Sequence, residues 1–275
     1  MRFICFLSVL TFLLTGCKKP SGGDDPEPET ACRIDKTSYS DGTYNSYRFD
    51  AGGKLTSSTL TYLDENDKIV EIPVTYEYNT AGNLVKSKTP DGWTDEYTYD
   101  ATGALTKVEF KNEQGQVEER FTVTTDAQKR ITQIKNTEDF IGTYTYDNNG
   151  NVTKVEVTWN NFIIDRSTYE YDQSSTAQAP ISAVKGHPFH PSNFTSDIIY
   201  SNPLNLTGGG KRPVKGKYET QYNEDWTGAG NTIRTYVDYT SVFKVNSQNF
   251  IVEESATDRI SSVTNTIKYT YSNCN

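Results

Sequence analysis

A short pattern that recurs along the chain constrains its fold more than any other feature. In residues 144–155, YTYDNNGNVTKV, two tyrosines alternate, an aspartate follows, and a glycine comes three residues later. Alternation predicts a strand. Asp-x-x-Gly predicts a tight turn, because Asp accepts hydrogen bonds from nearby backbone N–H groups and Gly can adopt the positive φ of a three-residue loop. The pattern therefore predicts a β-hairpin with Tyr146 opposite Val152 and Tyr144 opposite Lys154.

The frame Tyr-x-aromatic-Asp/Asn-x-x-Gly-x-Leu/Val occurs in full four times, and degenerate copies start at Val123 and Tyr169. The six starts lie 21 to 29 residues apart, within the range typical of repeat architectures. We assign a structural role to the turn residues of the full copies, which are Asp50 and Gly53, Asn79 and Gly82, Asp100 and Gly103, and Asp147 and Gly150.

These copies resemble the YD repeat of Rhs and teneurin-type proteins over about residues 44–172. The whole chain is similar to YD-like lipoproteins of unknown function that some Gram-negative bacteria export. The resemblance implies a series of hairpins and says little about chemistry. About six repeats are too few for the shell that the giant Rhs proteins build around a toxin.

Composition and patterning favour an all-β fold. The chain has 19 Tyr and one Met, and no segment shows a convincing helical period. The apolar positions change parity between Val152 and Val155, which predicts bulges and a sheet with both faces partly covered. We predict one antiparallel β-meander over residues 31–275, curled or barrel-like. We also predict that residues 173–217 are an insertion of loop with a short helix at 192–200.

Residues 1–17 have the features of a bacterial lipoprotein signal, with Arg2 followed by an apolar run and Leu-Thr-Gly-Cys. The apolar run of about 12 residues is too short to span a bilayer. The ending resembles a lipobox, which implies that Cys17 is acylated and anchors the chain to a membrane. Lys18 and the acidic residues that follow imply transport to the outer membrane, on its periplasmic side or at the cell surface. Residues 18–30 predict a flexible tether.

Two cysteines remain once Cys5 leaves with the signal and Cys17 carries the lipid. Secreted chains favour disulfides over free thiols, so we predict a bond between Cys32 and Cys274. In a sheet that closes on itself, this bond would hold the first strand against the last. In an open sheet, the two would be unrelated thiols.

Few residues suggest chemistry. The prolines beside His187 and His190 oppose a helix that would bring both rings together, so we predict no metal site and no cofactor. No Gly-x-Ser-x-Gly motif is present. The net charge of −9 disfavours nucleic acid as a partner. The candidates for surface binding are the tryptophans beside predicted turns, namely Trp93, Trp159 and Trp226.

The sequence favours a lipid-anchored protein of the cell envelope that acts as a non-enzymatic binding or scaffold module for glycan or protein. Most tyrosines are expected to form buried cross-strand ladders. The alternative is an extracytoplasmic polysaccharide hydrolase with a carboxylate pair. Paired acids in a deep cleft would favour the enzyme, and a shallow aromatic surface would favour binding.

Overall fold

The computed structural model describes residues 32–178, 211–221 and 233–272. Contacts divide the chain into two compact units, Met1–Thr30 and Ala31–Asn275, and all described residues belong to the second. These residues form sixteen strands and no helix, which confirms the predicted all-β class. The strands are β1 (Arg33–Tyr39), β2 (Tyr44–Phe49), β3 (Leu55–Leu63), β4 (Ile69–Tyr78), β5 (Leu84–Lys88), β6 (Thr94–Tyr99), β7 (Leu105–Lys111), β8 (Val117–Thr125), β9 (Ile131–Lys135), β10 (Ile141–Tyr146), β11 (Val152–Trp159), β12 (Phe162–Glu170), β13 (Lys215–Gln221), β14 (Ile233–Val245), β15 (Ile251–Asp258) and β16 (Thr264–Ser272).

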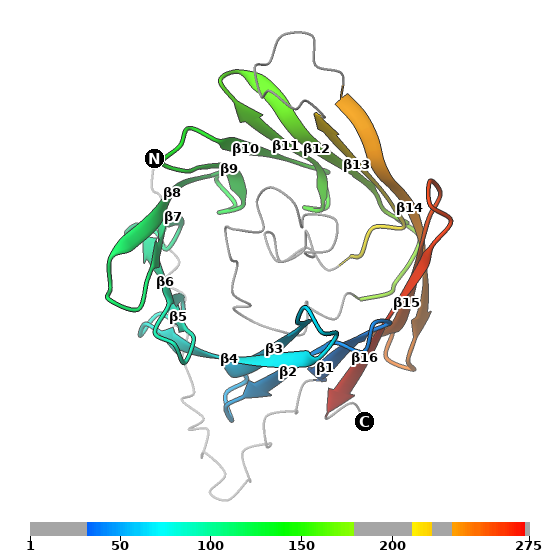
Figure 1. The fold of residues 1–275 in the computed structure, drawn as a ribbon, viewed down its shortest axis with the longest axis horizontal. Coiled ribbons are helices and arrows are strands. Elements are labelled where there is room, and N and C mark those ends of the chain that lie inside the picture. The colour runs from blue at the N-terminus through cyan, green and yellow to red at the C-terminus, as the bar shows by residue number, and fades with distance from the viewer. Residues whose placement is uncertain (1–31, 179–210, 222–232, 273–275) are drawn as a thin grey trace, which may run out of the picture. The chain divides into compact units, whose positions relative to one another are not determined.

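The strands form one closed barrel in chain order, which makes the predicted curled meander a complete ring (Figure 1). Each strand pairs antiparallel with its neighbours, and the ring closes where β1 pairs with β16, with Arg33 opposite Ser272. Closure leaves no strand at the edge of the sheet, so it removes the long unpaired edge that an open sheet would present to other chains.

Because the strands run alternately up and down, successive turns lie at opposite ends of the barrel. One end, which we call the YD rim, carries the turns 50–53, 79–82, 100–103, 126–129, 147–150 and 246–249. The other end, which we call the distal rim, carries the turns 40–43, 64–67, 89–92, 112–115, 136–139, 160–161 and 259–262. All four full copies of the sequence frame therefore turn at the same rim.

A bulge beside each turn of the YD rim corrects the cross-strand pairing expected from the sequence. Tyr146 lies opposite Val152, as predicted, but Tyr144 lies opposite Val155 and Thr145 lies opposite Lys154. The extra residue of the bulge shifts the register by one position. The same shift occurs at Arg48/Phe49, Glu77/Tyr78, Thr98/Tyr99, Thr124/Thr125 and Lys244/Val245.

The apolar core lies on one face of the closed sheet, the face that points into the barrel. Its larger cluster includes Val108, Ile134 and Val155, each 0–1% exposed, and its smaller cluster includes Leu55 and Ile251, both 0% exposed. The first tyrosine of three frames belongs to this face, since Tyr97, Tyr144 and Tyr169 are buried. The alternating pair Tyr269 and Tyr271 in β16 takes the corresponding positions, and Tyr269 is buried as well. The ladders expected of the tyrosines are therefore internal.

The repeat extends further along the chain than we predicted from the sequence. The degenerate copy at Val123 keeps its turn because Lys129 takes the glycine position with φ 63°. A further copy forms the hairpin between β14 and β15, where Asn246 takes the aspartate position and Asn249, with φ 65°, takes the glycine position. Asn tolerates positive φ better than most residues, which explains how this copy works without glycine.

The insertion predicted over residues 173–217 is described only at its ends. Residues 179–210, which include the predicted helix 192–200, His187 and His190, lie outside the described residues. Strand pairing resumes at Lys215 in β13, slightly before the boundary that we predicted. Gln178 pairs with Phe250 through an isolated parallel bridge.

Candidate functional site: two unlike rims

The second aromatic residue of the frame bonds two strands together at the YD rim. The hydroxyl of Tyr78 donates to the carbonyl oxygen of Leu55 (2.8 Å), Tyr99 to Leu84 (2.7 Å), Tyr171 to Val152 (2.6 Å), Tyr271 to Ile251 (2.7 Å), and Tyr146 to Ile131. Each acceptor is the apolar residue that follows the preceding turn. Burial raises the pKa of Tyr78 and Tyr99 to about 12. The tyrosines of this position are therefore structural.

These tyrosines occupy the places where neighbouring strands stop pairing. The ladder between β5 and β6 ends at Lys86 and Glu96, two residues short of Leu84. The backbone carbonyl of Leu84 therefore has no partner in that ladder, and it accepts a hydrogen bond from the Tyr99 hydroxyl instead. The spacing in the frame thus sets both the turn and the bond that closes the gap beside it. Sequence reasoning found the turn and missed the bond, because its partner lies in the previous repeat.

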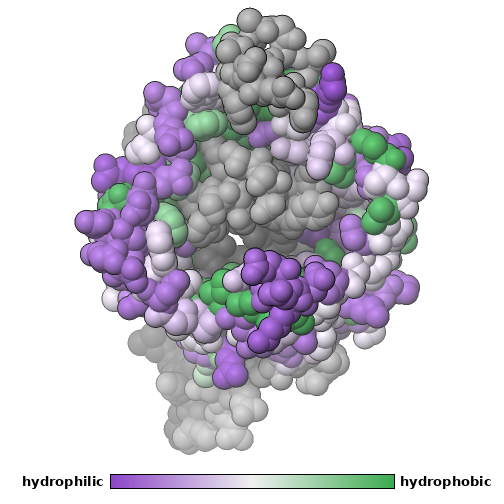
Figure 2. Space-filling view, viewed as in Figure 1, coloured by the Kyte–Doolittle hydropathy of each residue, from purple (hydrophilic) through white to green (hydrophobic). Residues whose placement is uncertain are grey.

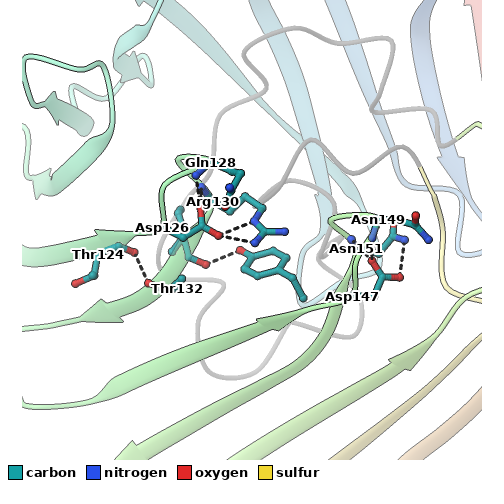
Figure 3. A network of polar contacts seen from close by, with 10 residues as sticks. Thr124, Asp126, Gln128, Arg130, Thr132, Asp147, Asn149 and Asn151 are labelled. Carbon is teal, nitrogen blue, oxygen red and sulfur yellow. Dashed lines mark hydrogen bonds and ion pairs between the residues drawn. The ribbon is translucent and has the colours of Figure 1, made fainter.

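The turn aspartates and asparagines of the frame hold the backbone of their own loops. Asp147 Oδ1 accepts hydrogen bonds from the N–H groups of Asn149 and Asn151, both at 2.9 Å (Figure 3). Hydrogen bonds from Thr102 and from the N–H of Ala104 hold the pKa of Asp100 below its usual value. The paired glycines have positive φ, 82° at Gly53, 85° at Gly82, 81° at Gly103 and 84° at Gly150.

Side chains also tie neighbouring turns of the YD rim to one another. Arg33 Nη1, at the start of β1, donates to the carbonyl oxygen of Asp50 at 3.1 Å. Lys129 donates to the carbonyl oxygen of Thr102, which lies in the neighbouring turn 100–103. Asn149 donates to Gln173 at 2.8 Å. Cations also lie over frame aromatics: Arg33 over Phe49, Lys54 over Tyr78, and Arg130, which pairs with Asp126, over Tyr146 (Figure 3). Side chains of the YD rim therefore hold its neighbouring turns together.

The distal rim carries most of the exposed large hydrophobic side chains of the described residues. Leu60, Tyr62, Ile69, Val117, Phe162, Tyr236, Ile260 and Val263 lie in or near its turns, whereas Val242 and Val245 lie toward the YD rim. Tyr236 is 70% exposed and meets Tyr218 edge to face. Exposed apolar side chains gathered at one end of a protein are typical of an interaction surface.

Two of the predicted surface tryptophans lie toward this rim. Trp93 is partly buried and stacks on Phe110 with ring centroids 4.8 Å apart, and Trp159 stacks on Phe140 at 5.8 Å. Trp226 lies outside the described residues. Stacking on a neighbour leaves part of each indole available to a ligand, so Trp93 and Trp159 stay candidates for binding.

The distal turns are also strongly acidic. Their acidic residues are Asp41, Asp64, Glu65, Asp67, Asp91, Glu113, Glu138 and Asp139, and their basic residues in the described part are Lys68 and Arg259. The turns of the YD rim balance four aspartates against Lys54, Lys129 and Arg130. The two ends of the barrel therefore present different fields to a partner.

The outer wall of the barrel is covered by charged side chains. Glu96, Glu109 and Glu156 alternate with the buried residues of their strands and so point outward. Ion pairs run between strands, including Lys86–Glu96 (3.5 Å), Arg120–Glu109 (2.8 Å), Arg166–Glu156 (2.8 Å) and Lys244–Glu253 (2.5 Å). Figure 2 shows hydrophilic residues around most of the periphery. A lysine or arginine that faces lipid at mid-membrane costs about 2–4 kcal/mol, so the cations of these ion pairs suit a wall that faces water.

The alternative of a hydrolase directs attention to buried carboxyl groups. Burial raises the pKa of Asp165, which accepts a hydrogen bond from the Tyr218 hydroxyl at 2.8 Å. Glu254, 4% exposed, pairs with Arg212 at 2.9 Å. Both groups have partners that explain them structurally, so neither one indicates catalysis. No group of His, Cys, Asp and Glu that could hold a metal occurs among the residues described.

The remaining predicted sites are partly described. Cys32 is disulfide-bonded and buried, while Cys17 and Cys274 lie outside the described residues, so the pairing of Cys32 with Cys274 stays a prediction. The pairing of Arg33 with Ser272 places the first and last described strands side by side. Within the described part of the chain, no helix is long and apolar enough to cross a bilayer.

Comparisons with known proteins agree with this geometry. A sequence model described as RHS Repeat matches residues 78–109, which run from the second frame into the third. This segment is therefore similar to an RHS repeat. No curated protein matches it.

The fold occurs in solved structures. A porin-like protein from Bacteroides uniformis ATCC 8492 is similar with a TM-score of 0.56 and 15% identity, over 86% of this chain and 96% of that one. A porin-like protein from Bacteroides vulgatus ATCC 8482 gives 0.42 at 15% identity, over 86% and 98%. The TcdB2-TccC3-TEV structure gives 0.27 at 15% identity, over 82% of this chain and 8% of that one. At these identities, the likeness to the first structure shows a shared barrel fold.

Proposed function

We propose that this protein is a non-enzymatic binding module of the cell envelope, held at the outer membrane by a lipid on Cys17, that engages glycan or protein through its distal rim. The concentration of exposed apolar side chains at one rim carries the proposal. The opposite rim uses its side chains to bond its own turns together. Tyr62 and Tyr236 are both exposed at this end, where each ring offers an apolar face and a hydroxyl group to a ligand.

In this proposal the barrel stands beside the membrane and is not inserted in it. Membrane barrels present an apolar band to lipid and polar groups to the interior. This barrel has the reverse arrangement, with Val155 and Tyr144 inside and Glu156 outside. The name of one structural neighbour, a porin-like protein, describes that protein; here the likeness supports an envelope setting, and the charged wall supports a lipid anchor.

Anchoring is tested by replacing the acylated residue. Cys17→Ala should move the protein from the membrane fraction to the soluble fraction and leave it folded without detergent. An unchanged membrane fraction would contradict the lipid anchor, and aggregation of the folded variant without detergent would contradict the water-facing wall.

Binding is tested on an array of glycans and on a panel of peptides, with the Cys17→Ala chain as the reference. Tyr62→Ser combined with Tyr236→Ser should remove the binding that the reference shows. Val245→Ser, an exposed apolar change at the opposite rim, is the matched control and should retain it. Loss in the control together with retention in the distal variant would overturn the proposal.

A further inference from the structure

The hairpin of β3 and β4 extends past the strands on either side of it. The pairing of β2 with β3 ends at Asn45 and Leu60, and that of β4 with β5 begins only at Thr75 and Lys88. Between these points β3 and β4 pair with each other as far as Leu63 and Ile69. The β4 backbone from 69 to 74 therefore lacks a ladder partner on its β5 side within this fully described region.

One face of the extended part is apolar and no longer covered. Leu60 pairs with Ile72 and Tyr62 with Val70, on the face that continues the barrel interior from Ser58 and Val74. Inside the barrel this face is closed, with Ser58 3% and Val74 7% exposed, whereas Leu60 is 39% and Tyr62 48% exposed. The face of β3 and β4 that is buried inside the barrel therefore becomes exposed to solvent where the two strands extend beyond their neighbours.

The tip of this hairpin is acidic. Its turn, residues 64–68, has the sequence DENDK. Asp64 stabilises the turn itself, because its Oδ1 accepts hydrogen bonds from the N–H groups of Asn66 and Lys68, both at 2.9 Å. Glu65 and Asp67 are exposed in the same turn. Uncovered apolar side chains next to exposed carboxylates complement a partner that is apolar on one side and basic on the other.

We propose that the apolar face of the β3–β4 hairpin docks a basic amphipathic segment of a partner protein, in extended conformation, with its cations toward Glu65 and Asp67. The proposal rests on the proposed function and names its partner. An extended segment suits a strand with an unpaired edge, because alternate side chains then fall on the apolar face. Pro73 removes one N–H donor from that edge, so the side-chain face, and not a complete ladder, supplies the recognition.

The test uses the full Cys17→Ala chain and three labelled decapeptides that alternate Val with Lys, Val with Glu, and Val with Thr. Fluorescence anisotropy should show binding of the Lys peptide at least ten times tighter than of the other two, and weakening with added salt. Equal affinities for the Lys and Glu peptides, or no binding of the Lys peptide, would overturn the proposal.

Variants separate the apolar and the charged contributions. Tyr62→Ser with Leu60→Ser should weaken Lys-peptide binding at least tenfold, and Val242→Ser, exposed on β14, is the matched control. Glu65→Gln with Asp67→Asn keeps the turn, because Asn tolerates the positive φ of 57° at position 67, and should remove most of the salt dependence. Circular dichroism checks that each variant folds. Glycan binding that depends on Tyr62, without peptide binding, would overturn this inference and leave the proposed function standing.

Discussion

Most turns of the two rims are of the same kind, and the rims differ in what surrounds these turns. At the YD rim, Asp147 and Gly150 close a loop through Asp147 N–H to Asn151 O at 2.9 Å and Gly150 N–H to Asp147 O at 3.1 Å. At the distal rim, Asn112 and Gly115 close theirs in the same way, at 3.0 and 2.8 Å. Among the described residues, hydrogen bonds from a tyrosine hydroxyl to a backbone carbonyl oxygen of the preceding repeat occur at the YD rim alone. One rim is therefore fixed by the repeat, and the other is free to vary.

The largest effect is expected where the chain returns into the barrel near the YD rim. Arg212→Met leaves the buried Glu254 carboxylate without its cation and should lower the free energy of unfolding by about 3–5 kcal/mol. The matched change at the distal rim is Arg259→Met, which breaks an exposed pair with Asp238 and should cost at most about 1 kcal/mol. Urea unfolding of both variants measures the difference. Equal losses would show that the two ends are equally supported.

A disulfide at the seam should come next. The barrel joins each successive pair of strands at the YD rim by a turn or an insertion, but β16 and β1 are separated by the whole chain. A bond between Cys32 and Cys274 would take the place of that missing turn. Cys274→Ser should then lower stability by about 2–4 kcal/mol. Alkylation of the unfolded, unreduced protein followed by mass measurement gives the direct test, since two labelled thiols would exclude the bond.

Much of the fold followed from the sequence because its signals are local. Asp100, Gly103 and the alternating tyrosines lie within a few residues of one another, so the hairpins could be predicted. Three features could not be predicted: the closed ring, the hydrogen bond from Tyr99 to the Leu84 carbonyl, and the copy of the frame at Asn246. Ring closure depends on contacts between the two ends of the chain, and Asn249 replaces the glycine on which the pattern relied.

Only part of the candidate site could be predicted from the sequence, for a physical reason. The sequence pointed to tryptophans beside turns, and the structure stacks Trp93 and Trp159 on neighbouring rings. In the sequence, nothing distinguishes Leu60 and Tyr62 from the core positions of an alternating strand. They are exposed only because β2 and β5 are shorter than β3 and β4, and strand length relative to a neighbour is not visible in a local pattern.

Glycine substitutions should show that the turns themselves do not distinguish the rims. Gly150→Val and Gly115→Val each force valine to a positive φ, 84° and 77°, and each should cost about 1–3 kcal/mol. Ala51→Val, exposed in a turn at a position without positive φ, is the control and should be close to neutral. Thermal melts of the three variants give the comparison. A much larger loss at one glycine would show that its rim depends on the turn itself.

The smallest effect concerns the hydroxyl of Tyr99, and its pH dependence separates it from simple loss of packing. Tyr99→Phe removes one hydrogen bond to the Leu84 carbonyl and should cost about 0.5–1.5 kcal/mol at neutral pH, whereas Tyr236→Phe at the distal rim, 70% exposed, should cost almost nothing. Burial raises the folded pKa of Tyr99 to about 12, against about 10 when unfolded.

Above pH 10 the unfolded chain therefore loses this proton before the folded chain does, and the stability that protonated Tyr99 contributes falls as pH rises toward 12. The wild type should lose stability more steeply than Tyr99→Phe between pH 10 and 12, so the cost of the substitution should shrink across that window. Unfolding titrations at several pH values measure both slopes. Equal pH dependence of the wild type and Tyr99→Phe would mean that Tyr99 titrates as an exposed phenol. The hydrogen bond from Tyr99 to Leu84 would then contribute nothing to the stability of this repeat.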